Sequence, residues 1–265
     1  MAQESTRIAA GVDVGTECVK ATIVADGGQV MGRAVMPTSG YFQAVVHEVL
    51  AAALDDAQRK EGDLAGIGAT GFGMHCVPAA TLTVQESACH ALGAFQQVGT
   101  AMTLVNVGGR DPHVITVDAR GRQLNSRGAR RCANGIGSFL MFAARHLDVS
   151  PTRLQELAAS AEGTAASVSS YCSVFSAADV LERLREGASR EAIALGCIRS
   201  IAERITEIGG LSAPVMICGG VAEYFPGVLH ALDELTGTKV HAVTDPIFTG
   251  AVGAALRVLH PVPEA

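Results

Sequence analysis

Short apolar runs built around a glycine open the chain and recur near its middle. The run from Val12 to Val24 turns at Gly15, and the run from Val105 to Val117 turns at Gly108. Each run predicts two strands joined by a tight turn, because β-branched residues favour strands and glycine favours turns. A further glycine closes each copy at the same offset. We therefore expect an internal duplication.

Most of the other apolar residues are spaced as in amphipathic helices. This spacing predicts helices over residues 41–60, 86–95, 136–147, 176–186, 189–208 and 251–259. Short apolar stretches at residues 65–73 and 215–218 predict further strands. Strands and helices in this order predict an α/β fold. We divide it into an N-terminal lobe (1–99) and a C-terminal lobe (100–265), with the last helix a candidate to pack back on the first lobe.

Composition narrows the class of protein. The chain has 265 residues, 48% of them apolar and 17% charged, which suffices for a buried core. No apolar run is long enough to span a membrane, and the N-terminus lacks a secretory signal, so we expect a cytoplasmic protein. A net charge of -6 without a basic tract argues against a nucleic-acid partner. The seven cysteines are then expected to be core residues, metal ligands or redox groups rather than disulfides.

Glycine turns follow four of the predicted strands, at Gly15, Gly71–Gly73, Gly108–Gly109 and Gly219–Gly220. In such turns, backbone N–H groups can approach anionic oxygens without side-chain obstruction. Asp13 carries a carboxylate suited to a hydrated Mg²⁺ ion. Thr16 is expected at the phosphate oxygens, and Gly219–Gly220 would let adenosine lie against the backbone. Asn106 matches Asp13 in the second copy and lacks the carboxylate.

Two cysteines precede predicted helices. Cys132 stands before the helix at 136–147, and Cys172 before the helix at 176–186, which Ser176 and Asp179 are predicted to cap. Helix N-termini favour a thiolate, the form that ligates iron. Two thiolates are half of the set that a four-cysteine iron–sulfur cluster requires, so the other pair would come from another subunit. Alternatively, a cysteine is simply a small residue of the apolar core, and we expect this for Cys18, Cys197 and Cys218.

Other sites are less well supported. Gly66, Gly68 and Gly71 satisfy G-x-G-x-x-G, but polar residues precede them where a dinucleotide-binding turn needs a strand. The sequence contains neither a P-loop nor a G-x-S-x-G elbow. A mononuclear metal site from His75–Cys76 and Cys89–His90 lacks the C-x-x-C spacing of structural zinc. His113 is expected on the outer face of the second hairpin.

The motifs together resemble the ATPase family shared by benzoyl-CoA reductases and the activators of 2-hydroxyacyl-CoA dehydratases. The resemblance spans nearly the whole chain. The matching segments are Gly11–Thr16, Ala69–Gly73, Ser87–Ala91, Gly108–Asp111, Cys132–Leu140, Ser169–Phe175, Gly219–Ala222 and Gly250–Ala255.

The resemblance implies the actin, Hsp70 and sugar-kinase type of fold, in which two ribonuclease-H-like lobes clamp ATP and Mg²⁺ in a cleft. It also implies that Cys132 and Cys172 hold one [4Fe–4S] cluster shared with a second copy or a homologous ATPase subunit. ATP hydrolysis would then drive a low-potential electron from ferredoxin or a similar donor to a partner that reduces a CoA thioester.

Site residues follow from the same resemblance. Asp13, Asn106 and Asp111 are the predicted catalytic residues. The predicted nucleotide-binding residues are Gly11, Asp13, Gly15, Thr16, Lys20, Gly71, Gly108, Gly109, Gly219, Gly220 and Val221. The chain departs from the family pattern at Asn106, where the family has aspartate, at Arg110, where it has glutamine, and in the segment 133–137. We expect the loss of the aspartate to slow hydrolysis.

Four functions remain after these observations. We favour a benzoyl-CoA-reductase-type subunit, because the arginine- and alanine-rich usage is typical of a GC-rich genome and Asn106 suggests a degenerate copy in a heterodimer. A homodimeric activator of a 2-hydroxyacyl-CoA dehydratase is the alternative. A small-molecule kinase of the same fold and a cluster-free nucleotide-binding regulator complete the set.

Overall fold

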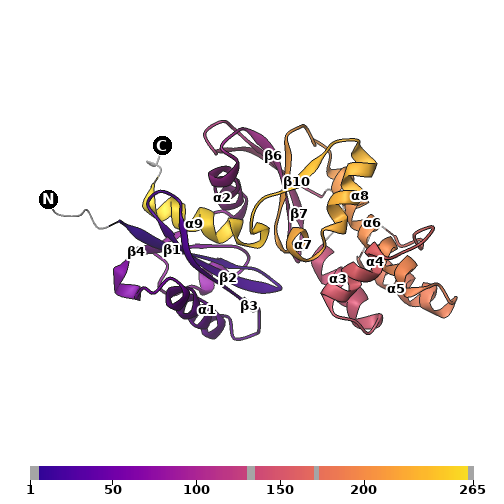
Figure 1. The fold of residues 1–265 in the computed structure, drawn as a ribbon. Coiled ribbons are helices and arrows are strands. Elements are labelled where there is room, and N and C mark those ends of the chain that lie inside the picture. The colour runs from indigo at the N-terminus through magenta and orange to yellow at the C-terminus, as the bar shows by residue number, and fades with distance from the viewer. Residues whose placement is uncertain (1–5, 130–134, 170–172, 262–265) are drawn as a thin grey trace. The chain divides into compact units, whose positions relative to one another are not determined.

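The structure is a computed structural model that describes residues 6–129, 135–169 and 173–261. The chain forms two compact units (Figure 1). The first runs to Thr100 and also includes Val117–Gln123 and the chain from Ile247 onward; the second comprises Ala101–Thr116 and Leu124–Pro246. The helix at the C-terminal end is therefore grouped with the N-terminal residues.

The first unit is built on a five-stranded sheet of order β3-β2-β1-β4-β5. Its central strand, β1, pairs antiparallel with β2 and parallel with β4. The strands are β1 (Ile8–Val14), β2 (Cys18–Ala25), β3 (Val30–Pro37), β4 (Leu64–Thr70) and β5 (Leu82–Thr83). The helices are α1 (Phe42–Asp56), α2 (Glu86–Val98) and α9 (Thr249–Leu259), with short 3₁₀ turns η1 (Glu61–Asp63), η2 (Met74–Cys76) and η3 (Pro246–Phe248).

Helices cover both faces of this sheet. Val46 and Val49 of α1 belong to the apolar cluster on one face, and Val252 and Leu256 of α9 belong to the cluster on the other. Helix α9 packs very close to β1, since a Cβ atom on Gly11 would lie 1.8 Å from the Ala251 carbonyl oxygen. Glycine at position 11 is thus explained by packing between a strand and a helix backbone.

The second unit repeats this sheet. Its strand order is β8-β7-β6-β9-β10, which matches β3-β2-β1-β4-β5 strand for strand, and β6 pairs parallel with β9 as β1 does with β4. The shared topology agrees with the duplication predicted from the sequence. The strands are β6 (Met102–Val107), β7 (Pro112–Val117), β8 (Gln123–Gly128), β9 (Val215–Cys218) and β10 (Val240–Ala242).

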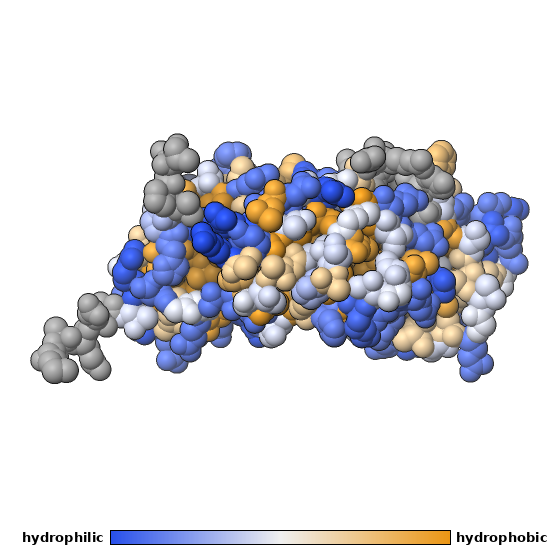
Figure 2. Space-filling model, turned by 90° about the horizontal axis from the view of Figure 1, so that it is seen from above, coloured by the Kyte–Doolittle hydropathy of each residue, from blue (hydrophilic) through white to orange (hydrophobic). Residues whose placement is uncertain are grey.

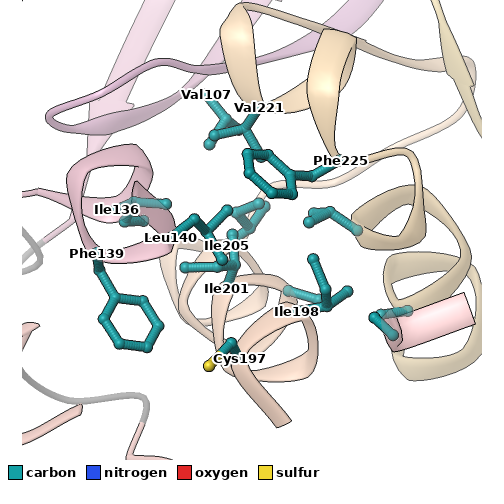
Figure 3. Close-up of a cluster of buried hydrophobic side chains, with 14 of the residues drawn as sticks. Val107, Ile136, Phe139, Leu140, Cys197, Ile198, Ile201, Ile205, Val221 and Phe225 are labelled. Atoms are coloured by element: carbon teal, nitrogen blue, oxygen red, sulfur yellow. The ribbon is translucent and has the colours of Figure 1, made fainter. Parts of the chain in front are cut away.

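Six helices surround the second sheet in the described residues. They are α3 (Ile136–His146), α4 (Pro151–Ala159), α5 (Ser173–Arg185), α6 (Arg190–Ile208), α7 (Gly220–Tyr224) and α8 (Gly227–Thr236). Ile136 and Leu140 of α3 face Ile201 and Ile205 of α6 in the apolar core (Figure 3). Helices α3 and α6 pack against each other through this core, which also contains Val107 at the end of β6.

A charged side chain, Arg204, is buried between these helices. Arg204 of α6 is 2% exposed and donates from Nη2 to the Ser169 carbonyl oxygen at 3.2 Å and to the Ser176 hydroxyl. Its guanidinium lies 5.4 Å from the centre of the Phe139 ring on α3. A buried cation held by polar and aromatic partners links α3, α5 and α6.

The predicted cap of helix α5 is wrong. Helix α5 begins at Ser173, so Ser176 lies inside it, and the Ser176 hydroxyl donates to the Ser169 carbonyl oxygen at 2.7 Å. The Asp179 carboxylate instead accepts a hydrogen bond from the Ser169 backbone N–H at 2.8 Å. Both side chains therefore anchor the segment before the helix instead of its first turn.

No helix in the described part of the chain is long and apolar enough to cross a membrane. The face shown in Figure 2 carries hydrophilic and hydrophobic residues side by side.

Candidate functional site

Asp13 is a buried carboxylate at the end of β1. The antiparallel register places it directly opposite Lys20 on β2, and Asp13 Oδ2 lies 3.1 Å from Lys20 Nζ. The two side chains are only 4% and 11% exposed, so this is a buried ion pair. The Gly15 N–H donates to the Cys18 carbonyl oxygen at 3.1 Å, which closes the turn between the two strands. Thr16 lies in this turn and is partly exposed.

The charges of this pair depend on each other. Burial by itself lowers the pKa of Lys20, but the charge of Asp13, its hydrogen bond and the neighbouring Cys18 and Glu86 together outweigh burial, so the pKa of Lys20 lies above its usual value. Burial also raises the pKa of the Cys18 thiol, against the influence of Lys20. Lys20 therefore stays an ammonium, and Cys18 stays a neutral thiol at neutral pH.

Two glycines make room for the Asp13 carboxylate. Gly71 follows β4 with φ +84°, and a Cβ atom there would lie 2.4 Å from Asp13 Oδ1. A Cβ atom on Gly250, at the start of α9, would lie 3.0 Å from both Asp13 Oδ2 and His90 Cε1. Any larger residue at either position would displace the carboxylate. Position 71 additionally needs glycine for its left-handed backbone.

His90 is a buried neighbour of this carboxylate that sequence analysis did not place here. Its Nδ1 lies 2.8 Å from Thr249 Oγ1, and its Nε2 lies 3.7 Å from a Glu86 carboxylate oxygen. Cys89–His90 and Thr249–Gly250 were visible in the sequence, the first as a weak metal candidate and the second as the residues before a helix. Only the packing of α2 against α9 joins them at the end of β1.

The second unit has a matching strand end at Asn106. This residue is 3% exposed at the end of β6 and pairs in register with Cys218 of β9, whose thiol donates to Asn106 Oδ1 at 3.7 Å. Gly219 follows β9 with φ +96°, and a Cβ atom there would lie 2.9 Å from Asn106 Oδ1 and 2.4 Å from the Val107 carbonyl oxygen. Asn106 and Gly219 thus repeat the arrangement of Asp13 and Gly71.

The remaining predicted residues of this unit surround that strand end. Neither packing nor backbone conformation requires glycine at Gly108 or Gly220, since a Cβ atom would meet nothing within 4 Å and neither residue has positive φ. The Gly109 carbonyl oxygen accepts the Ser138 N–H of α3 at 3.1 Å. Asp111 Oδ2 lies 3.1 Å from the neighbouring Arg110 Nε. Val221 is 2% exposed, and its side chain is part of the apolar core.

The cysteines fall into two groups. Cys132 and Cys172, the predicted cluster ligands, lie outside the described residues. Burial raises the pKa of Cys89 and of Cys197 to about 12, which disfavours the thiolate. Within the described ranges, no group of three His, Cys, Asp or Glu side chains has the geometry of a metal site. The alternative site at His75–Cys76 and Cys89–His90 is therefore not supported there.

Comparison with known proteins agrees with the sequence resemblance. Residues 10–258 match the model of the BadF/BadG/BcrA/BcrD ATPase family. The activator of lactoyl-CoA dehydratase from Anaerotignum propionicum is 34% identical over 93% of this chain and 95% of its own length. The (R)-2-hydroxyglutaryl-CoA dehydratase activating ATPase from Acidaminococcus fermentans is 33% identical, with the same coverage.

Solved structures lead to the same fold. The activator of the 2-hydroxyisocaproyl-CoA dehydratase from Clostridium difficile, with bound ADPNP, superposes with a TM-score of 0.86 at 26% identity, covering 95% of this chain and 94% of that one. A ROK family glucokinase from Streptomyces griseus shares the fold alone, with a TM-score of 0.57 at 14% identity over 94% of this chain and 98% of its own. The predicted actin, Hsp70 and sugar-kinase fold is confirmed.

The comparisons change the order of the predicted functions. A benzoyl-CoA reductase component from Thauera aromatica is 27% identical over 94% of this chain and 92% of its own, less than the two activating ATPases. The activator alternative is thus better supported than the benzoyl-CoA-reductase role that we favoured. Our preference rested partly on amino-acid usage, which reflects the base composition of the genome and not the reaction. On its family match and these relatives, the chain belongs to the BadF/BadG/BcrA/BcrD ATPase family.

Proposed function

We propose that this protein is an ATP-dependent activator of a 2-hydroxyacyl-CoA dehydratase. The observation that carries the proposal is the similarity, over nearly the full length of both chains, to the activator of lactoyl-CoA dehydratase. In this role the protein would hydrolyse ATP and deliver a low-potential electron from ferredoxin or a similar donor to the dehydratase. Its partner would thus act on a CoA thioester.

The first unit supplies groups suited to phosphates and Mg²⁺. The turn at Gly15 contains Thr16, which is partly exposed and could contact phosphate oxygens. Asp13 supplies a carboxylate, which Mg²⁺ usually contacts through water. Lys20 holds Asp13 in a single position, since their ion pair is buried. The pair keeps a carboxylate at the strand end, and a carboxylate is the group through which a hydrated Mg²⁺ ion would be held.

The second unit supplies backbone positions suited to a nucleotide. Gly108 and Gly220 follow the adjacent parallel strands β6 and β9, so they lie at the same edge of the sheet. A Cβ atom at either position would meet nothing within 4 Å in the described part of the protein, so packing does not explain the two glycines. A ligand that approaches the backbone closely would explain them. A similar solved structure carries bound ADPNP, which supports ATP as the ligand.

Cys132 and Cys172 remain the proposed ligands of a [4Fe–4S] cluster shared with a second copy of the chain. Three of the described cysteines support this choice indirectly, because burial raises the pKa of Cys18, Cys89 and Cys197 and makes them poor ligands. When bound, such a cluster supplies one-electron chemistry at low potential.

Anaerobic reconstitution tests the proposal. The purified protein is combined with a 2-hydroxyacyl-CoA dehydratase component, Mg·ATP and a reduced electron donor, and dehydration of the acyl-CoA is followed. Iron and acid-labile sulfide are measured in parallel on the wild type, on Cys132→Ser and on the control Cys76→Ser, which changes a partly exposed cysteine of the first unit.

The expected result is ATP-dependent dehydration by the wild type and by Cys76→Ser, with loss of iron and of activation in Cys132→Ser. A wild type that binds and hydrolyses ATP but contains no iron under strict anaerobiosis would contradict the electron-transfer role and favour the nucleotide-binding regulator. Activation of a benzoyl-CoA-reducing partner, tested in the same way, without activation of the dehydratase would restore the reductase assignment.

A further inference from the structure

Helices α2 and α9 touch at backbone distance beside the Asp13 carboxylate. A Cβ atom on Gly93 of α2 would lie 2.0 Å from the Thr249 carbonyl oxygen, and one on Gly253 of α9 would lie 1.9 Å from the Cys89 carbonyl oxygen. Glycine at both positions lets the two helix backbones approach without side chains between them. The first turn of α9 is therefore packed directly against α2.

A buried polar contact joins the same two helices. His90 of α2 is 3% exposed, and its Nδ1 lies 2.8 Å from Oγ1 of Thr249, the first residue of α9. His90 Nε2 lies 3.7 Å from an oxygen of the Glu86 carboxylate, which accepts hydrogen bonds and does not donate them. The proton of the neutral ring is thus assigned to Nε2, and Nδ1 accepts the Thr249 hydroxyl.

Carboxylate, imidazole and hydroxyl follow one another here in the order of a hydrolase triad. Thr249 is 0% exposed, however, so its hydroxyl is closed to a substrate. The contact is not a helix cap either, because the N-cap position of α9 is Phe248, which makes no side-chain hydrogen bond. The contact between His90 and Thr249 instead fixes the first residue of α9 to α2.

The residue after Thr249 meets the carboxylate to which we assign Mg²⁺. A Cβ atom on Gly250 would lie 3.0 Å from Asp13 Oδ2 and 3.0 Å from His90 Cε1. Asp13 and His90 therefore approach the same point of α9. The N-terminus of a helix carries a partial positive charge, which favours an ionised carboxylate beside it. The place of α9 thus affects both the position and the charge of Asp13.

We propose that His90 is a positioning residue for Mg²⁺ binding: it holds Thr249, and thereby fixes the start of α9 against the Asp13 carboxylate. The inference rests on the proposed function, which assigns the hydrated ion to Asp13. His90 does not contact the ion itself, since its two ring nitrogens face Thr249 and Glu86. Lys20 restrains the same carboxylate from β2, so the two restraints come from different elements.

A Mg²⁺ titration in the presence of ADPNP tests the proposal, because this analogue separates binding from hydrolysis. Wild type is compared with His90→Ala, with Thr249→Val, which removes the hydroxyl at nearly constant shape, and with Thr249→Ser, which keeps it. The control Leu92→Ala shortens another side chain of α2 that packs with α9. We expect His90→Ala and Thr249→Val to raise the half-saturating Mg²⁺ concentration roughly tenfold, as loss of a residue that orients a metal ligand does. Thr249→Ser and Leu92→Ala should stay within about twofold of the wild type.

Three results would overturn the inference. Unchanged Mg²⁺ dependence in both His90→Ala and Thr249→Val would mean that their contact does not position Asp13. An equal rise in Leu92→Ala would assign the effect to packing between the helices, and an equal rise in Thr249→Ser would exclude the hydrogen bond as its cause. A wild type that binds no ADPNP at any Mg²⁺ concentration would instead contradict the proposed function. Melting curves establish that each variant is folded, and Thr249→Val decides the question if His90→Ala is not.

Discussion

The buried ion pair between Asp13 and Lys20 yields a quantitative prediction. Replacing Lys20 with methionine keeps the unbranched stem of the side chain, without the ammonium, and leaves the Asp13 carboxylate buried and uncompensated. At 3.1 Å and an effective dielectric constant of 20, the lost attraction is about 5 kcal/mol. The removed ammonium no longer has to be desolvated, so the net loss is smaller. We expect Lys20→Met to lower the free energy of unfolding by about 3 kcal/mol.

A double-mutant cycle separates this pairing from ordinary packing. Asp13→Asn alone should also be destabilising, since it leaves a buried ammonium. The double variant, which is neutral at both positions, should recover most of the loss and lie within about 1 kcal/mol of the wild type. Denaturant unfolding without nucleotide measures all four proteins. The exposed pair between Lys239 and Asp233 is the control, and Lys239→Met should cost less than about 1 kcal/mol.

The pH dependence of the same cycle follows from the sign of the shift. The pKa of Lys20 is higher in the folded state than its ordinary value of 10.5. The stabilisation is therefore fully present below the unfolded-state pKa and is lost as pH rises through the folded-state pKa. The difference between wild type and Lys20→Met should be equal at about pH 7 and pH 9. A loss below about 1 kcal/mol for Lys20→Met, or a double variant as unstable as the sum of the single ones, would refute the reasoning.

Two further predictions concern packing. Gly11→Ala should lower the melting temperature strongly, because its Cβ atom would lie 1.8 Å from the Ala251 carbonyl oxygen, whereas Gly62→Ala meets nothing within 4 Å and should melt as the wild type does; equal melting of the two would contradict the close approach of α9. Arg204→Met should destabilise by about 2 kcal/mol through loss of its contacts with Ser169 and Ser176, and Arg199→Met, at an exposed position of the same helix, by less than about 0.5 kcal/mol; similar losses in urea unfolding would show that burial does not set the effect.

Sequence periodicity was a good guide to the longer helices. The helix expected at 189–208 is Arg190–Ile208, and the helix expected at 136–147 is Ile136–His146. Both have one continuous apolar face, so their own sequence carries the signal. No prediction covered β3 and β10. Strand β3 is an edge strand with a mixed burial pattern, and β10 has three residues, so their positions depend on the strands they pair with.

The candidate site was predictable only where it is local in sequence. Asp13 and its glycine turn were found because an apolar strand leads directly into them, and Lys20 lies on the next strand of the same hairpin. His90 and Gly250 lie on helices far apart along the chain, and no local pattern states that α2 and α9 meet beside Asp13. The contact of Asp179 was missed for a related reason, since its partner, the Ser169 backbone N–H, precedes the helix for which we predicted Asp179 as part of the cap.

The duplicated sheet separates what the backbone requires from what the chemistry requires. The glycine after the neighbouring strand is present in both units, at Gly71 and Gly219, because the strand-end side chain and the adjacent carbonyl oxygen leave no space for a Cβ atom. The strand-end residue itself differs, since aspartate and asparagine have the same shape and both fit beside that glycine. Packing therefore allows either residue at position 106, and the two residues differ in charge, which Lys20 compensates only beside Asp13. The exchange at position 106 therefore changes the charge of the strand end, whereas the repeated glycine beside it reports the fold.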